Sequence, residues 1–473
     1  LIKPLARPQI NSQRLDVELL SSVEDVKLFL EPKSVAVVGV PRRAGDGSNV
    51  LENLMWYGYK GQIYPVNPRA KEILGIKCYP SVGELPGVVD LAIIETASHI
   101  VPSIMQDCVD RGIRAIIIQT DGFAELSTEG KILQEEIISI AHSGGARILG
   151  PNTFGVINTF RNLATPFAQF ELQKSPIAVI SQSGIFSTGH LYELPLGKVI
   201  DLGNACDIGF CEALEYLAQD SDTRIILLHV EEISNARYFG ELARKVSRTK
   251  PIITIQGGKS QPGARLMRSH SGSLGGKQEI IEAALHQYGI IQAEDLEEMK
   301  DLTRALLGSP PMEGRGLAIM TYTMGGAVMF LDACHQYGLT LAKLSSETAQ
   351  KIRALLPRPE ALANPVDLMP FFQVATTTAN ETYKKLLFHL LSDKSVHAVV
   401  FISASFSPIM EALVPIITEC MHNFPRKPVI TWIWGPGKEN LGDIGQFNYL
   451  SANSAARALN VLRSVNRNKL FRM

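Results

Sequence analysis

The stretch Ser34-Val35-Ala36-Val37-Val38-Gly39-Val40 decides the fold class of this chain, together with the loop Pro41-Arg42-Arg43-Ala44-Gly45-Asp46-Gly47-Ser48 that follows it. A short, continuous apolar run of this kind predicts a parallel strand that is buried on both faces. After the loop, apolar residues recur with helical spacing over residues 50–55. A strand, a glycine-bearing loop and a helix in this order are typical of the start of a Rossmann fold, where the loop cradles phosphate groups.

The loop and the next strand argue against a site for NAD. The loop lacks the spacing G-x-G-x-x-G, and the strand at residues 62–66 ends in Asn67-Pro68-Arg69, where an NAD site would place an acid for the ribose diol. An NAD-linked dehydrogenase is therefore disfavoured. Arg42, Arg43 and Arg69 supply positive charge instead. Guanidinium groups suit a phosphorylated ribose and a pyrophosphate, as in coenzyme A; the plain alternative is a solvated basic rim.

Two further apolar runs predict parallel strands with polar residues at their ends. Residues 91–94 are followed by Glu95-Thr96, and residues 115–118 by Gln119-Thr120-Asp121-Gly122. Ligands of such folds bind beyond the carboxyl ends of the strands, so these tips form the expected walls of the coenzyme site. The residues expected to contact the coenzyme are Gly39, Pro41, Arg42, Arg43, Asn67, Pro68, Arg69, Thr96, Thr120 and Asp121.

The alternation of strands and helices along the chain predicts an α/β protein with three consecutive doubly wound domains. Prolines and weak periodicity mark an N-terminal arm, and the run Pro310–Gly314 is typical of a linker. We expect the arm at residues 1–23 and the three domains at residues 24–150, 151–309 and 310–473.

The second domain contains a histidine in a loop of small residues, Arg265–Gly276. Helical spacing begins directly after it, over residues 280–288. Glycines and serines ahead of a helix can direct backbone N–H groups at a phosphate, and the helix dipole adds to the attraction. A neutral imidazole nitrogen of His270 in that setting can accept a phosphoryl group and pass it on. The plain alternative is a surface loop that happens to hold a histidine.

Two strand ends in the same domain can face this loop. A strand at residues 177–180 is followed at once by Ser181-Gln182-Ser183-Gly184, which provides either a second anion seat or an N-capping serine. The strand at residues 224–230 ends in Glu231-Glu232. One of these carboxylates can accept the imidazole N–H and make the other ring nitrogen more basic, unless both are exposed acids of a loop. Residues 201–207 are expected to form a loop ahead of the next helix.

Composition excludes several classes of partner. The 473 residues are 45% apolar and carry a net charge of −1, which suggests neither a nucleic-acid surface nor a basic membrane anchor. The six cysteines include no CxxC pair, so buried thiols in the cytoplasm are expected and a metal site is not. No apolar run is long enough to span a membrane. Because the chain begins at Leu1, removal of a leader stays open.

A series of short motifs, each weak alone, occurs in a fixed order over roughly residues 24–370. The motifs are Ala36–Gly39, Pro65–Pro68, Gly122–Glu125, Gly150–Asn152, Ser181–Gly184, Gly203-Asn204 with Asp207, Ser269–Gly272 and Asn364–Asp367. In their order and spacing the chain resembles the α subunit, or α portion, of the ADP-forming acyl-CoA synthetases, relatives of succinyl-CoA synthetase. The resemblance implies a Rossmann-like CoA-binding domain followed by two flavodoxin-like domains of the succinyl-CoA synthetase type.

The resemblance also implies roles for individual residues. His270 is the histidine that is phosphorylated, and Glu231 is the acid that holds it. The family usually has glycine where this chain has Glu232, so the choice between the two acids stays open. The residues implied to bind the phosphoryl group are Asn152, Ser183, Gly184, Ser271 and Gly272.

The implied reaction is ATP + carboxylate + CoA ⇌ ADP + phosphate + acyl-CoA, through an acyl phosphate and a phosphohistidine. An ATP-grasp pattern is not found in the chain, so the resemblance implies that ATP, ADP and Mg²⁺ bind to a separate β subunit. It implies a hetero-oligomer, or a dimer of the α chain, and leaves the carboxylic acid open. The alternative is a non-catalytic regulatory protein that senses acyl-CoA. His270 argues against that alternative, because such modules often lack the histidine.

Overall fold

The computed structural model describes residues 23–41, 49–168, 173–184, 194–257, 259–263, 265, 278–358, 361–373, 376–404, 410–435, 441, 445 and 447–470. Almost all of the expected N-terminal arm lies outside these ranges. The same holds for Arg42, Arg43, His270, Ser271 and Gly272.

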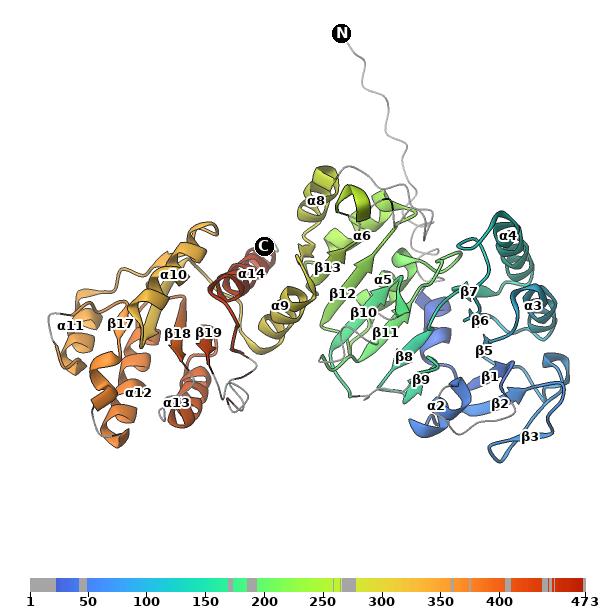
Figure 1. Cartoon of the computed structure of the whole chain (residues 1–473), viewed down its shortest axis with the longest axis horizontal. Coiled ribbons are helices and arrows are strands. Elements are labelled where there is room, and N and C mark those ends of the chain that lie inside the picture. Colours follow the sequence, from blue (N-terminus) through green and yellow to red (C-terminus); the bar gives the residue numbers. More distant parts are fainter. Residues whose placement is uncertain are drawn as a thin grey trace, which may run out of the picture. The chain divides into compact units, whose positions relative to one another are not determined.

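The chain folds into two compact units, Leu1–Gln292 and Ala293–Met473. Within the described residues, the first unit contains two large sheets, one parallel and one mixed, and a small antiparallel pair of β3 (Glu72–Ile73) and β4 (Ile76–Lys77). The second unit contains one parallel sheet (Figure 1). The domain boundaries predicted at residues 150 and 309 remain predictions.

The first sheet has five parallel strands in the order β2-β1-β5-β6-β7. The central strands consist of wholly buried residues, as expected for strands covered by helices on both faces. From β1 the chain winds first to β2 on one side and then to β5 on the other, which puts the switch point at β1. The strands are β1 (Ser34–Val38), β2 (Gln62–Val66), β5 (Leu91–Ile94), β6 (Ala115–Ile118) and β7 (Arg147–Leu149), and the helices are α2 (Val50–Trp56), α3 (Val101–Asp110) and α4 (Thr128–Ser143).

The second sheet of the first unit has the order β14-β13-β12-β10-β11-β8-β9. Strands β10 to β14 are parallel, and β8 and β9 form an antiparallel edge. The winding direction changes at β10, as it does at β1 in the first sheet. The strands are β8 (Val156–Asn158), β9 (Leu163–Ala164), β10 (Ile177–Ser181), β11 (Lys198–Asp201), β12 (Ile225–Val230), β13 (Ile252–Gln256) and β14 (Ile291–Gln292); the helices are α5 (Phe210–Gln219), α6 (Ala236–Val246) and α8 (Gln278–Gln287).

One detail of the second sheet corrects the sequence analysis. Asp201, expected at the start of a loop, is the last residue of β11 and is buried. Its register with Ser181 of β10 is parallel. A carboxylate therefore lies at the carboxyl end of the sheet, where ligands of such folds bind.

The two sheets of the first unit share one apolar core. Buried Val35 and Val37 of β1 belong to the same cluster as Val156 of β8 and Ile180 of β10. The first sheet and the second sheet are therefore held in one compact body, and residues from both can line one site.

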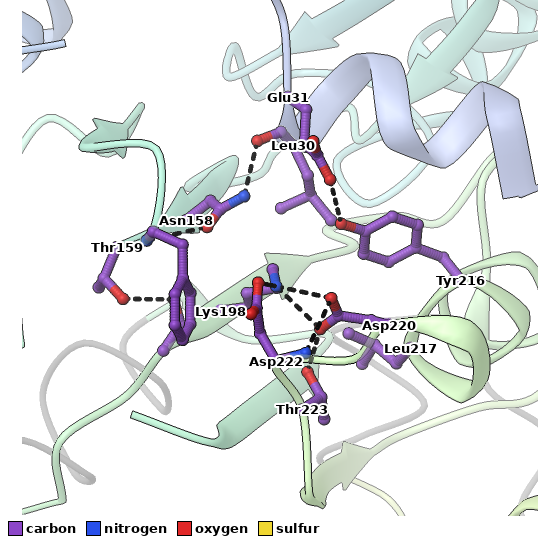
Figure 2. Close-up of polar contacts among 12 residues, drawn as sticks. Leu30, Glu31, Asn158, Thr159, Lys198, Tyr216, Leu217, Asp220, Asp222 and Thr223 are labelled. Carbon is purple, nitrogen blue, oxygen red and sulfur yellow. Dashed lines mark hydrogen bonds and ion pairs between the residues drawn. The ribbon is translucent and has the colours of Figure 1, made fainter. Parts of the chain in front are cut away.

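A buried polar cluster reinforces this junction at the end of the second sheet opposite the carboxyl ends of its parallel strands (Figure 2). Lys198 is 2% exposed, and its Nζ donates to both oxygens of Asp220 at 2.8 Å and to Asp222 at 3.0 Å. Two contacts reach the turn before β1: Asn158 Nδ2 donates to Leu30 O at 3.0 Å, and the Tyr216 hydroxyl donates to Glu31 at 3.2 Å. The cluster thus ties the second sheet to the start of the first.

The second unit carries a parallel sheet in the order β16-β15-β18-β19, with β17 paired to β15. Its strands are β15 (Gly316–Thr321), β16 (Thr340–Leu341), β17 (Val366–Asp367), β18 (Ala398–Ala404) and β19 (Val429–Trp434). Its helices are α9 (Leu296–Gly308), α10 (Met324–His335), α11 (Ser346–Leu355), α12 (Thr376–Ser392), α13 (Met410–Asn423) and α14 (Ala452–Leu470). Parallel strands that alternate with helices in both units confirm the predicted α/β class.

None of the helices within the described ranges has the length and apolar character that crossing a membrane requires. The six cysteines are all free thiols. Within the same ranges no group of His, Cys, Asp and Glu side chains could hold a metal ion.

Candidate functional site

A cavity of about 510 Å³ lies in the first unit at the carboxyl ends of its strands. It brings together residues that the sequence analysis assigned to two different tasks. Thr96, Thr120 and Asp121 were expected to contact a coenzyme, whereas Asn152, Ser183 and Gly184 were expected to bind a phosphoryl group. The remaining lining residues are Glu95, Gln119, Thr153, Phe154, Phe167 and Gln182.

The end of β1 comes very close to the end of β5. Gly39 has φ +100°, and a Cβ there would lie 2.2 Å from the carbonyl oxygen of Glu95. Only glycine fits this approach, which brings Gly39 beside Glu95 of the cavity wall. Asn67 is occupied nearby, because its Nδ2 donates to Val40 O at 2.8 Å and its Oδ1 accepts from Arg69 N at 2.8 Å. Asn67 braces the ends of β1 and β2.

The wall made by β5 and β6 contains polar atoms that lack partners. The Thr120 hydroxyl donates to Thr96 O at 2.7 Å, which locks the two strand tips together. Gln119 Nε2 donates to Thr165 O at 2.8 Å and to Phe154 O at 3.3 Å. Thr96 Oγ1 and Gln119 Oε1 are buried, and no other described residue hydrogen-bonds to them. Because buried polar atoms are nearly always paired, these two atoms are suited to a polar ligand in the cavity.

Glu95 is a half-buried acid in the same wall. Burial raises its pKa from an ordinary value of 4.5 to about 7. The carboxyl group therefore changes its charge near neutral pH, at the point where the first sheet meets the cavity.

The turn that carries Asn152 is held from both sheets. Asn152 has φ +57°, which asparagine tolerates better than most residues. Its backbone N–H donates to Thr120 O at 2.9 Å, and the N–H of Asn204 donates to Pro151 O at 2.9 Å. The side chain of Asn204 in turn contacts Glu125, in the loop between β6 and α4, and Gln134 of α4. Asn152 is thus fixed in the cavity lining.

Asp201 forms hydrogen bonds to the next two residues of the lining, Thr153 and Phe154. Its Oδ2 accepts from Phe154 N at 2.6 Å and from Thr153 Oγ1 at 3.0 Å. Burial raises the pKa of Asp201 to about 7. The Phe154 ring packs against Phe167 with centroids 4.6 Å apart, and a Cβ on Gly184 would lie 2.0 Å from that ring. The two aromatic rings give the polar cavity one apolar wall.

The turn after β10 is joined to the end of β12. Ser183 N donates to Ser181 Oγ at 2.9 Å, and Ser181 Oγ donates back to Ser183 O at 2.8 Å. Gln182 Oε1 accepts from the N–H groups of both Glu231 and Glu232, at 2.8 and 2.9 Å. Glu231 is half-buried and raises the pKa of Asp201 through its charge, whereas Glu232 is exposed. Neither acid is among the residues that line the large cavity, and Glu232 lines a second cavity of about 180 Å³, so the choice between the two acids remains a prediction.

Several predicted residues are not part of this cavity lining. Gly39, Pro41, Asn67, Pro68 and Arg69 lie at the ends of β1 and β2 and do not line the cavity. Arg42, Arg43, His270, Ser271 and Gly272 fall outside the described residues.

The comparisons with known proteins agree with this arrangement. Residues 33–159 match a family model described as a CoA binding domain, and residues 174–306 match a succinyl-CoA ligase like flavodoxin domain. The chain is 37% identical over 382 residues to the α subunit of ADP-forming acetate–CoA ligase II of Pyrococcus furiosus, covering 79% of this chain and 81% of that protein. This chain belongs to the α-subunit family of ADP-forming acyl-CoA synthetases.

Two more members of the family cover nearly the whole chain. The α subunit of ADP-forming acetate–CoA ligase I of Pyrococcus furiosus is 34% identical over 422 residues, which are 87% of this chain and 90% of that protein. The dinucleotide-forming acetyl-coenzyme A synthetase 1 of Ca. Korarchaeum cryptofilum, solved with phosphate and ADP, superposes with a TM-score of 0.84 at 30% identity, covering 94% of this chain and 98% of that chain. The predicted family, fold class, CoA-binding domain and ligase class of this synthetase α subunit are confirmed.

Some cavity residues were not assigned a role from the sequence. Phe154, Phe167 and Asp201 line or support the cavity through contacts across 13 residues or more of chain, which no local pattern reveals. Glu95 lies in a strand tip that was predicted to wall the coenzyme site, and Gln182 lies in a predicted strand-to-helix turn, but neither was named as a site residue.

Proposed function

We propose that this synthetase α subunit works with an ATP-grasp β subunit on a separate chain to convert ATP, a small carboxylic acid and CoA into ADP, phosphate and acyl-CoA. The observation that carries the proposal is the cavity, because it joins the strand tips of the CoA-binding sheet to the turn of Ser183 and Gly184 and to Asn152. The Pyrococcus furiosus relatives are named as acetate–CoA ligases, which supports a small acid as substrate.

The chemistry consists of three transfers. First, a nitrogen of His270 attacks the γ-phosphorus of ATP, the bond to the β–γ bridging oxygen breaks, and ADP leaves. Second, a carboxylate oxygen of the acid attacks that phosphorus and the N–P bond breaks, which forms an acyl phosphate. Third, the CoA thiol attacks the acyl carbon, the bond to the phosphate oxygen breaks, and the thiol proton passes to the released phosphate. Each step exchanges one bond for another, and no oxidant or reductant is needed.

The residues of the chain serve these steps in different ways. His270 must be neutral to attack, and Glu231 stabilises the positive charge of the phosphorylated ring. Asn152, Ser183, Gly184, Ser271 and Gly272 bind the phosphoryl oxygens. Thr96, Thr120 and Asp121, which line the same cavity, contact CoA. Gly39, Pro41, Arg42, Arg43, Asn67, Pro68 and Arg69 form the predicted seat for the phosphates and ribose of CoA.

The proposal also covers the subunit assembly and the cellular compartment of the enzyme. ATP, ADP and Mg²⁺ bind to the β subunit, and the complex is a hetero-oligomer, or contains a dimer of the α chain. The compartment is the cytoplasm, which is supported by six free cysteines.

The proposal is tested by reconstitution. The purified chain, an ATP-grasp β subunit of the same family, and both together are incubated with ATP, Mg²⁺, CoA and acetate, and acetyl-CoA and ADP are measured. We expect product only when both chains are present. Steady formation of acyl-CoA by this chain alone, free of other proteins, contradicts the division of labour.

A further inference from the structure

Gln182 lies between two cavities of the first unit. It lines the large cavity beside Ser183 and Gly184. It also lines a second cavity of about 180 Å³, together with Glu232, Asn235 and other residues. Of the described residues, Gln182 alone belongs to both linings. A polar side chain at this place is positioned to contact a ligand in either cavity.

The hydrogen bonds of Gln182 fix the orientation of its amide. Both of its protein contacts are backbone N–H groups, of Glu231 at 2.8 Å and of Glu232 at 2.9 Å. An N–H group only donates, so both must face the amide oxygen, and the nitrogen and oxygen of this side chain cannot be exchanged. The chemistry of the partners therefore determines which end of the amide is left over.

The end that is left over is a donor. Within the described ranges, Gln182 Nε2 has no hydrogen-bond partner, and neither has the hydroxyl of the neighbouring Ser183. Gln182 is half-buried, so the amide hydrogens have limited access to water. Donors that are preorganised in this way stabilise an anion without having to reorganise when it binds.

We propose that Gln182 has two tasks: its Oε1 positions the turn of Glu231, and its Nε2 donates a hydrogen bond to the phosphoryl oxygens during transfer between His270 and the carboxylic acid. The inference rests on the proposed function of the chain. It makes Gln182 a catalytic residue for phosphoryl transfer, because one rigid amide connects the acid that supports the histidine with the group that is transferred.

Two substitutions separate the two tasks. Gln182→Glu keeps an oxygen that accepts from both N–H groups, but it replaces the donor by a second, negatively charged oxygen. Gln182→Ala removes the acceptor and the donor together. If Gln182 only braces the turn of Glu231, the glutamate variant works and the alanine variant is impaired. If Nε2 contacts the phosphoryl group, the glutamate variant is the worse of the two, because its carboxylate repels the phosphoryl oxygens.

The experiment measures labelling of the chain, in complex with its β subunit, after incubation with acetyl-CoA and radioactive inorganic phosphate over a range of phosphate concentrations. We expect Gln182→Glu to raise the half-saturating phosphate concentration by about 10- to 100-fold, the scale of a hydrogen bond to a charged group. Gln182→Ala should raise it less. CoA binding by calorimetry and the midpoint of thermal unfolding should stay unchanged in the glutamate variant, which shows that it folds.

The possible results have distinct meanings. If the Gln182→Glu variant is labelled to the same extent as the wild type and with the same dependence on phosphate concentration, the donor role is refuted and the proposed function stays intact. Absence of label in the wild-type complex contradicts the proposed function itself, and the role of Gln182 falls with it.

Discussion

The carboxylate of Asp201, at the end of β11, accepts a 2.6 Å hydrogen bond from the backbone N–H of Phe154. This contact joins the second sheet to the turn that carries Asn152 and Phe154. The Thr153 hydroxyl donates to the same oxygen at 3.0 Å. One buried acid therefore determines the position of a polar and an aromatic residue in the cavity lining.

Two substitutions of Asp201 should distinguish the effect of its hydrogen bonds on stability from the effect of its charge. Asp201→Ala leaves the N–H of Phe154 without its acceptor, whereas the Thr153 hydroxyl keeps its contact with the backbone oxygen of residue 201, so we expect a loss of about 1–3 kcal/mol in the free energy of unfolding. Asp201→Asn retains an oxygen acceptor and is the matched control, with a smaller loss. Denaturant unfolding of the three proteins measures both. Equal stability of the alanine and asparagine variants would show that the contacts to Thr153 and Phe154 do not matter.

Glu95 should make stability depend on pH. Its pKa is raised by burial to about 7, so the folded chain holds the proton more tightly than the unfolded chain. Wild-type stability should therefore fall as the pH rises from about 4.5 to 7 and level off above that range. Glu95→Gln removes this contribution, and we expect the variant to exceed the wild type by about 1–3 kcal/mol at pH 8 and to match it at pH 4. Asp201, whose pKa burial also raises to about 7, still makes the stability of the variant fall over the same pH range. A constant difference between the proteins at all pH values would contradict the assignment.

The aromatic wall should influence the choice of acid. Phe154→Ala removes a ring that packs against Phe167 and enlarges the cavity. We expect the reconstituted complex to gain activity on larger acids relative to acetate by about 10-fold, the scale on which pockets distinguish a methylene group. The measurement is kcat/KM for acetate, butyrate and phenylacetate. An unchanged order of preference means that the acyl group binds elsewhere.

The buried Lys198 should matter for stability and not for chemistry. Its ion pair with Asp220 lies at the end of the sheet opposite the cavity. Lys198→Ala leaves the Asp220 carboxylate buried without its partner, so we expect a loss of about 3–5 kcal/mol. The exposed pair of Lys351 and Glu347 is the control, and Lys351→Ala should have no measurable effect. Thermal unfolding compares the stability of the two variants, and similar midpoints would show that burial of the ion pair does not matter.

The sequence predicted the parts of this site that depend on local patterns. Apolar runs followed by polar residues located the strand tips that carry Thr96, Thr120, Asp121 and Ser183. The sequence assigned the first three to a coenzyme and Ser183 to a phosphoryl group, and only the structure shows that all four line one cavity. The contacts that shape the lining were beyond such patterns. Asp201 contacts Phe154 across 47 residues of chain, and Gln182 contacts Glu231 across 49. Both contacts depend on the register of neighbouring strands, which the sequence analysis did not determine.

The choice of coenzyme is tested by calorimetry on the isolated chain. Asn67 braces two strand ends and supplies no acid for a ribose diol. We therefore expect binding of CoA and none of NAD. Replacing Arg42 and Arg43 by alanine should weaken CoA more than dephospho-CoA, if these cations contact the 3′-phosphate. Tighter binding of NAD than of CoA would refute the reading of the first domain.

The phosphorylation of His270 is the central claim, and one labelling experiment tests it most directly. The chain is incubated with acetyl-CoA and radioactive phosphate, and the label is examined for the lability in acid and stability in base that mark a phosphohistidine. We predict that His270→Asn abolishes the label and leaves CoA binding intact. Glu231→Gln should lower labelling by about 100-fold, the scale for loss of an orienting or electrostatic partner, and more than Glu232→Gln does. Label that persists in His270→Asn would contradict the account.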